Sequence, residues 1–138
     1  MTATPIDVAT LPPIAVRLAL GGEALAVDGG SGAARVRYTP GQSHANPAGT
    51  VFGGFLAAMI DDAAGLAAWF GGGRRPFVTA QLSVNYLRAA RPGEPLLAEA
   101  ALLGKGARQA FVDVRLMREA DRKLVASATV LQTFTAEA

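Results

Sequence analysis

Residues 46–70 read NPAGTVFGGFLAAMIDDAAGLAAWF. A glycine pair, Gly53 and Gly54, opens a run of helix-forming residues that continues to Phe70. Within this stretch apolar residues recur every three or four positions, which is the pattern of a helix that packs on a core. They are Phe52, Leu56, Met59, Ile60, Ala63, Leu66, Ala67 and Phe70. The sequence therefore predicts one central helix over 53–70.

The opposite face of this helix carries small residues and one carboxylate: Gly54, Ala57, Ala58, Asp61, Ala64, Gly65 and Ala68. No Lys, Arg, Glu or Gln solvates it, so we expect another backbone nearby and a helix covered on nearly all sides. Asp61 lies in the middle of this face, and Asp62 lies about 100° away at its flank. A buried carboxylate is costly unless it is paired or used. Each Asp is thus a candidate functional group, with a solvated helix residue as the alternative.

The composition restricts the class of protein and the chemistry available to it. The chain has 138 residues, 51% hydrophobic and 17% charged, which fits a single globular domain with much buried surface, some of it between subunits. It contains no Cys and a single His, His44, so neither a disulfide framework nor a Cys or His metal site is expected. Catalysis would then depend on carboxylate, hydroxyl, amide or backbone groups, with no metal and no cofactor.

Charge and terminal sequence indicate which partners to expect. The net charge is +2, without a basic run or an aromatic stacking motif, so no nucleic-acid partner is expected. Two Asp in the middle of the predicted helix oppose a membrane span, since each would add about 2.5–3.5 kcal/mol to insertion. The first residues lack the charged and apolar segments of a signal peptide. We expect a cytoplasmic protein.

The rest of the chain predicts mainly strands. Residues 1–10 lack a periodic pattern and are expected to form a loose terminus, and 11–20 predict a short helix with Pro13 in its first turn. Six strands are expected at 23–28, 33–39, 77–89, 96–103, 109–118 and 123–135, the last four as a meander. In the strand at 77–89, apolar Leu82 and Val84 alternate with a polar face that includes Thr79. The order predicts an α+β fold with the sheet wrapped around the helix.

The loop at 40–49 and the helix start together offer the groups needed for acyl transfer. The N–H groups of Gly53 and Gly54 would be unpaired at the positive end of the helix dipole. Asn46 could add a side-chain amide, and Asp61, about two turns further on, could act as a base or a nucleophile. Each signal alone has a plainer interpretation: Asn46 as a turn residue, and His44 as a loop or surface histidine.

The order of these groups resembles that of a known family. Asn46-Pro-Ala-Gly49, Phe-Gly-Gly54 and Asp61, with Thr79 and Tyr86 in the next strand, resemble the PaaI-like hotdog-fold thioesterases of the 4-hydroxybenzoyl-CoA thioesterase superfamily. The resemblance runs from about residue 18 to 134. It implies a single hotdog domain over 1–138, with a long central helix wrapped by a six-stranded antiparallel sheet. It further implies homodimers formed by sheet pairing, often dimers of dimers, with active sites shared between subunits.

The resemblance also implies roles for individual residues. Asn46 and Gly53 would hold the thioester carbonyl, and Asp61 would activate water or attack directly. A hydroxyl from the strand of the partner chain would place the water, and Thr79 occupies that position. The expected substrate-binding residues are Phe52, Gly54, Asp62 and Arg88. Arg88 is one of several cations that could meet the CoA phosphates, with Arg74, Arg75, Arg91, Lys105 and Arg108.

One departure from the family pattern leaves the function open to alternatives. Many members have His at the position of Phe52, so the contribution of that His to substrate orientation is absent; a Phe there also fits the core stripe as a packing residue. The expected function is an acyl-CoA thioesterase acting on aryl- or fatty-acyl-CoA. The alternatives are a catalytically weak hotdog protein that binds acyl-CoA and a dehydratase or hydratase acting on acyl thioesters.

Overall fold

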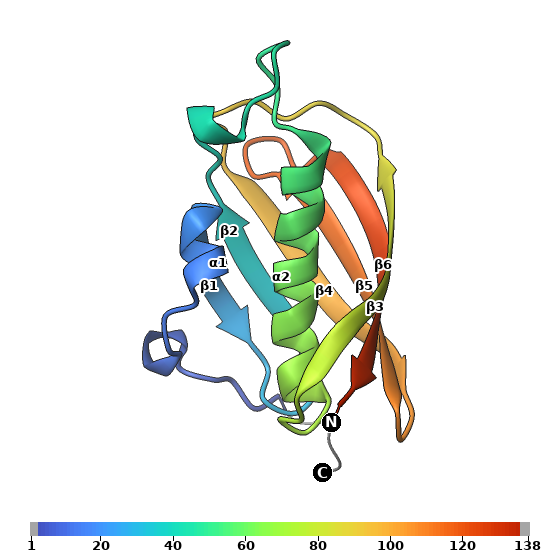
Figure 1. Ribbon diagram of the computed structural model, residues 1–138. Helices are drawn as coiled ribbons and strands as arrows, with labels where there is room; N and C mark the ends of the chain where they lie inside the picture. The colour runs from blue at the N-terminus through green and yellow to red at the C-terminus, as the bar shows by residue number, and fades with distance from the viewer. Residues whose placement is uncertain (1–2, 136–138) are drawn as a thin grey trace.

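The computed structural model describes residues 3–135 of the chain. One long helix, α2 (Gly53–Gly71), lies against a six-stranded antiparallel sheet that curves around it (Figure 1). The strands are β1 (Gly22–Val27), β2 (Ala34–Tyr38), β3 (Phe77–Tyr86), β4 (Leu96–Lys105), β5 (Gln109–Arg118) and β6 (Leu124–Phe134). A short helix, α1 (Ala15–Ala19), and two 3-10 turns, η1 (Val8–Thr10) and η2 (Gln42–His44), complete the described elements. The predicted helix, the six strands and the α+β class are confirmed.

The strand order is β1-β2-β4-β5-β6-β3. Only β4, β5 and β6 form a meander, so the predicted four-strand meander is wrong at its first strand. β3 pairs with β6 and not with β4. The segment 87–95 that follows β3 is not a tight hairpin; it carries the chain past β6 and β5 to the position of β4 (Figure 1). β4 takes β2 as its other neighbour. β1 and β3 are therefore the two edges of the sheet.

Helix α2 buries the predicted apolar stripe with one exception. Leu56, Met59, Ile60 and the other stripe residues within the helix are all buried, whereas Phe52 is 54% exposed. Phe52 is the N-cap residue and has extended backbone angles, φ −59° and ψ 133°, so the helical period does not set its direction. The interpretation of Phe52 as a core-packing residue is wrong.

The small-residue face of α2 is only partly covered by the chain itself. Ala64 and Ala68 are buried, while Ala57 and Ala58 are half-buried and Gly54 is exposed. This face is therefore covered at Ala64 and Ala68, and its N-terminal half keeps an accessible strip of small residues. The expected cover over that strip is not supplied within residues 3–135.

Strand β3 contains a bulge that changes which side chains face the helix. Thr79 pairs with Gln132 of β6, and the register then shifts so that Ala80 has no partner. One extra residue reverses the alternation of faces, so Thr79 lies on the helix side together with Leu82 and Val84. The predicted alternation, which put Thr79 on the opposite face from Leu82, is corrected by this bulge.

The N-terminal segment lies along β1 rather than apart from the domain. Ile6 N–H donates to Val27 O at 2.9 Å, and Gly29 N–H donates to Thr4 O at 2.6 Å. These backbone bonds leave no trace in a side-chain pattern, and a loose terminus was therefore expected for residues 1–10, of which 1 and 2 lie outside the described part. Helix α1 is shorter than predicted because Ile14 before it is extended, which leaves Pro13 outside the helix.

Candidate active site

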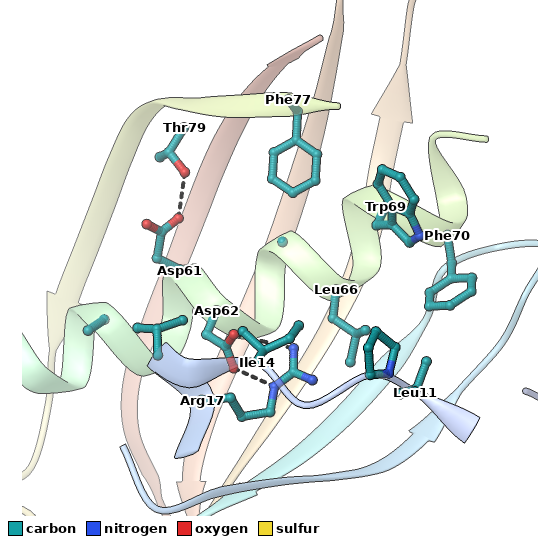
Figure 2. Close-up of a pocket in the computed structure, with 14 residues that line it drawn as sticks. Leu11, Ile14, Arg17, Asp61, Asp62, Leu66, Trp69, Phe70, Phe77 and Thr79 are labelled. Carbon is teal, nitrogen blue, oxygen red and sulfur yellow. Dashed lines mark hydrogen bonds and ion pairs between the residues drawn. The ribbon is translucent and has the colours of Figure 1, made fainter. Parts of the chain in front are cut away.

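Asp61 meets Thr79 at the middle of α2. The Thr79 hydroxyl of β3 donates to Asp61 Oδ1 at 2.7 Å, and the two side chains point toward each other in Figure 2. The bulge at Ala80 gives Thr79 this direction. The resemblance implied a hydroxyl from a partner chain, whereas Thr79 here reaches the Asp61 of its own chain. Carboxylate and hydroxyl together can hold a water molecule and accept its proton.

A cavity of about 540 Å³ opens beside this pair. Its walls are the C-terminal half of α2, Phe77 of β3 and the segment before α1, and Figure 2 shows their side chains around it. The apolar lining residues are Leu11, Pro12, Ile14, Val16, Ala58, Gly65, Leu66, Trp69, Phe70 and Phe77. Such a cavity suits an apolar group whose reactive end lies at the polar groups, here Asp61 and Thr79.

The side chain of Asp62, the next residue along, is nearly inaccessible to solvent, and both of its oxygens are paired. Arg17 of α1 donates to both of its oxygens, Nε to Oδ2 at 2.8 Å and Nη2 to Oδ1 at 3.3 Å. The Tyr38 hydroxyl of β2 donates to Oδ2 at 2.7 Å. The side chains of Arg17 and Asp62 are only 8% and 5% exposed, so the alternative of a solvated helix residue is wrong for Asp62.

The partners of Asp62 fix three elements together. Burial, and then the negative charge of Asp62, raises the pKa of Tyr38 well above its ordinary value, so the phenol stays protonated and remains a donor. Arg17 joins α1 to α2, and with it the segment that walls the cavity (Figure 2). Sequence reasoning missed both partners, since they lie 45 and 24 residues from Asp62 and no local pattern links them.

The start of α2 has unpaired N–H groups. No side chain caps this helix, and within the described residues neither Gly53 N–H nor Gly54 N–H has a backbone partner. Tyr86 donates its hydroxyl to Gly53 O at 2.8 Å, which holds the end of β3 against the helix start. Two free N–H groups at the positive end of a helix dipole can stabilise a carbonyl oxygen that gains charge.

Asn46 and His44 organise the loop before the helix. Asn46 Oδ1 accepts from the N–H groups of Ala48 and Thr50 at 3.0 and 3.1 Å, and its Nδ2 donates to Thr50 Oγ1 at 2.9 Å. This is the turn geometry expected of Asn in such a loop. His44 is buried, with Nδ1 accepting from Gly41 N–H and Nε2 2.8 Å from Ala19 O. His44 is thus a loop residue, as expected, but not a surface one.

The chain by itself does not bring all the predicted groups to one point. Gly53 and Asp61 are separated by eight helical residues, which is about 12 Å along the axis. One thioester carbonyl cannot touch both within a single copy. Arg88, a predicted CoA contact, donates Nη1 to Leu124 O at 2.8 Å and is exposed beyond the end of β3.

Two kinds of feature are absent from the part of the chain that the structure covers. Residues 3–135 contain no cluster of three or more His, Cys, Asp or Glu side chains able to hold a metal ion. None of the helices in this part has the length and apolarity required to cross a bilayer.

Comparisons with known proteins identify the family of this chain. The model of the thioesterase superfamily matches residues 48–125. Human acyl-coenzyme A thioesterase 13 is 31% identical over 85 residues, which are 62% of this chain and 61% of the human protein. The chain thus matches less than two thirds of that relative's length.

Solved structures match over most of the chain. A phenylacetic acid degradation-related protein from Ralstonia eutropha JMP134 is 34% identical, with a TM-score of 0.79 over 89% of this chain and 92% of that one. A hypothetical thioesterase protein from Streptococcus pneumoniae TIGR4, solved with coenzyme A, is 25% identical, with a TM-score of 0.77 over 84% and 87%. The hotdog fold that the sequence predicted is confirmed. Because the model of this family matches more than half of its length, this chain belongs to the thioesterase superfamily.

Proposed function

We propose that this protein is a thioester hydrolase that cleaves an acyl-CoA into a free acid and CoA. One observation carries the proposal: an apolar cavity of about 540 Å³ that ends at a carboxylate held by a single hydroxyl. Membership of the thioesterase superfamily supports the reaction class. The matched acyl-coenzyme A thioesterase 13 and the relative solved with coenzyme A support CoA as the carrier.

In the proposed reaction Asp61 acts as a general base toward water. Thr79 holds Oδ1, and the water gives its proton to Asp61 while its oxygen attacks the thioester carbon. The carbonyl oxygen takes up the negative charge of the tetrahedral intermediate. When the intermediate collapses, the carbon–sulfur bond breaks and the CoA thiolate takes the proton back from Asp61. The products are a carboxylic acid and free CoA.

The oxyanion would be held by Gly53 N–H and Asn46 of a second copy of the chain. The separation of about 12 Å between Gly53 and Asp61 within one copy supports this division. Two surfaces are suited to the second copy: the open edge of β3 and the accessible strip of small residues on α2. A homodimer, alone or as a dimer of dimers, would then contain two shared sites. A monomer by light scattering at micromolar concentration would contradict this part of the proposal.

The lining of the cavity supports an apolar acyl group as the substrate. It is lined by aliphatic and aromatic side chains, with Trp69 and Phe77 beyond Asp61, so it fits an aryl or fatty-acyl group rather than a polar one. The CoA portion would lie outside it. Phe52 and Gly54 at the helix start, and Arg88 with other exposed cations, are the proposed contacts for that portion. Asp62 would affect substrate binding indirectly, because its ion pair with Arg17 holds the cavity wall in place.

The proposal is tested by free-thiol release from a panel of aryl, short-chain and long-chain acyl-CoAs, with wild type and Asp61→Asn side by side. We expect turnover of aryl or longer acyl-CoAs by wild type and a loss of about a hundredfold or more in the variant. Silence of the folded wild-type protein across the panel would overturn the proposal. Binding of acyl-CoA without turnover would then favour the acyl-CoA-binding protein.

A further inference from the structure

Gln132 is a buried polar side chain directly behind the Asp61–Thr79 pair. It lies on β6 opposite Thr79 in the strand register and is 0% exposed. Its neighbours on the same face of β6, Val130 and Phe134, are apolar and buried. An amide at such a position costs free energy unless its polar atoms are paired. We therefore expect the Gln132 amide to serve the polar groups that it contacts.

Within residues 3–135, the one polar contact of its side chain is the Thr79 hydroxyl. Gln132 Oε1 lies 3.0 Å from Thr79 Oγ1, and Gln132 Nε2 is buried without a partner in the described part of the chain. Thr79 Oγ1 also lies 2.7 Å from Asp61 Oδ1. A hydroxyl carries one proton, so it cannot donate to a carboxylate and to an amide oxygen at once.

Turning the Gln132 amide by 180° resolves this conflict. The two ends of the amide have nearly the same shape, and the hydrogen-bond network decides which end faces which partner. With Nε2 toward Thr79, the amide donates to Oγ1, and the hydroxyl donates its proton to Asp61 Oδ1. The buried donor gains a partner, and the unpaired atom becomes a carbonyl oxygen, which is better tolerated.

Resting on the thioesterase function proposed above, we infer that Gln132 is a positioning residue for the reaction. It donates to Thr79 and so commits the Thr79 proton to Asp61. Oδ1 of Asp61 is then occupied, and Oδ2, which has no partner among the described residues, is left to receive the proton of the attacking water. Gln132 touches neither water nor substrate; it acts through Thr79.

Gln132→Met separates this role from a merely structural one. Met has a similar length and no donor, so it fills the same space and removes an imperfectly paired polar group from the core. We expect the melting temperature to stay the same or rise. We expect kcat for the best substrate of the acyl-CoA panel to fall about tenfold, with KM within about twofold, because an interaction that orients the base is lost. A structural residue would lower the melting temperature instead.

A double-mutant cycle with Thr79→Val tests the route through Thr79. If Gln132 acts through this hydroxyl, Gln132→Met should lower kcat no further once Thr79→Val is present. Val130→Ala, at the next inward position of β6, is the matched control; it should lower stability and leave kcat unchanged. Additive losses in the double variant, or wild-type kcat in Gln132→Met, would overturn the inference.

The outcome for Gln132 can be distinguished from that of the proposed function. If wild type hydrolyses acyl-CoA and Asp61→Asn does not, the function stands, and an unchanged kcat in Gln132→Met overturns the positioning role alone. If wild type hydrolyses no member of the panel, both proposals fall together.

Discussion

Asp61 and Asp62 are adjacent on α2, yet the two sides of the helix treat them differently. On one side Arg17 and Tyr38 give Asp62 three hydrogen bonds in a buried position. On the other side Asp61 accepts a single bond from Thr79 and lines an open cavity. Both carboxylates line the same cavity, but among the described residues only Asp61 has an oxygen without a hydrogen-bond partner.

Asp61 and Asp62 have the same side chain, and their different hydrogen-bond partners suit them to different roles. A carboxylate whose two oxygens accept hydrogen bonds from a guanidinium and a phenol has no oxygen left to hold a reacting water molecule. A carboxylate held by one hydroxyl keeps a free lone pair directed at its surroundings. The Asp62 side fastens α1 and β2 to the helix, and the Asp61 side is where we place the chemistry. Substitutions on the two sides should therefore change different properties of the protein.

The largest expected effect is on stability, from Asp62→Asn. This change leaves Arg17 buried with its charge uncompensated, so the free energy of unfolding should fall by about 3–5 kcal/mol in urea titrations. Replacing the whole cluster, Arg17→Met with Tyr38→Phe and Asp62→Leu, should restore most of the loss. If Asp62→Asn unfolds at the wild-type urea concentration, the ion pair does not hold α1 in place.

Asp61→Asn should do the reverse. We expect kcat to fall by about a hundredfold or more, equivalent to roughly 2.7 kcal/mol in the barrier, because the general base is lost. The urea midpoint should stay near that of wild type, since Thr79 can still donate to the amide oxygen. A large loss of stability in this variant would mean that Asp61, like Asp62, mainly stabilises the fold, and it would contradict the proposed difference between the two carboxylates.

Tyr38→Phe tests the Asp62 side more gently. It removes one hydrogen-bond donor from the carboxylate and leaves the ring in the core. The free energy of unfolding should therefore fall by about 1.5–3 kcal/mol, the range for a hydrogen bond to a charged group. kcat at a temperature where the variant is folded should be unchanged. A fall in kcat comparable to that in Asp61→Asn would show that the two sides of the helix are coupled.

The smallest expected effect concerns a third carboxylate, Asp28, which ties the N-terminal segment down. Hydrogen bonds from the side chain and backbone of Ser31, and from Thr4 N–H, lower the pKa of Asp28 to about 2 from 3.8. A depressed pKa in the folded state means that the stabilisation is present above about pH 4 and is lost as the pH falls toward 2. Protection of Ile6 N–H from hydrogen exchange should decrease over this range in wild type. In Asp28→Asn the protection should be lower at neutral pH and should not change between pH 4 and 2 on this account.

Much of the fold follows from local patterns. The apolar stripe between Leu56 and Phe70 predicts the helix, because a period of 3.6 residues is a property of the chain alone. Alternation and turn residues likewise predict the six strands. The small-residue face makes Asp61 a candidate, because a carboxylate without solvating neighbours needs a use. The structure confirms the helix and the six strands and adds one residue to the C-terminal end of the helix, while the role of Asp61 stays a prediction.

Other features depend on contacts between distant residues. Pairing of β3 with β6 in place of β4 is decided by the course of the segment at 87–95 and by competition between strand edges. The bulge at Ala80 depends on the β6 register, so alternation alone placed Thr79 on the wrong face. The exposure of Phe52 depends on where the helix begins.

By itself the sequence determined the elements, the α+β class and the carboxylate to examine first, since periodicity and turn chemistry act over a few residues. Only the tertiary structure decided which Asp is paired, that Thr79 contacts the Asp61 of its own chain, and that the Gln132 amide lies next to Thr79. Arg17 and Tyr38 reach Asp62 from other elements, and Gln132 reaches Thr79 from the neighbouring strand β6. Charge pairing and hydrogen bonding act through space, so residues far apart in the chain decide the state of each carboxylate only once the sheet has closed around the helix.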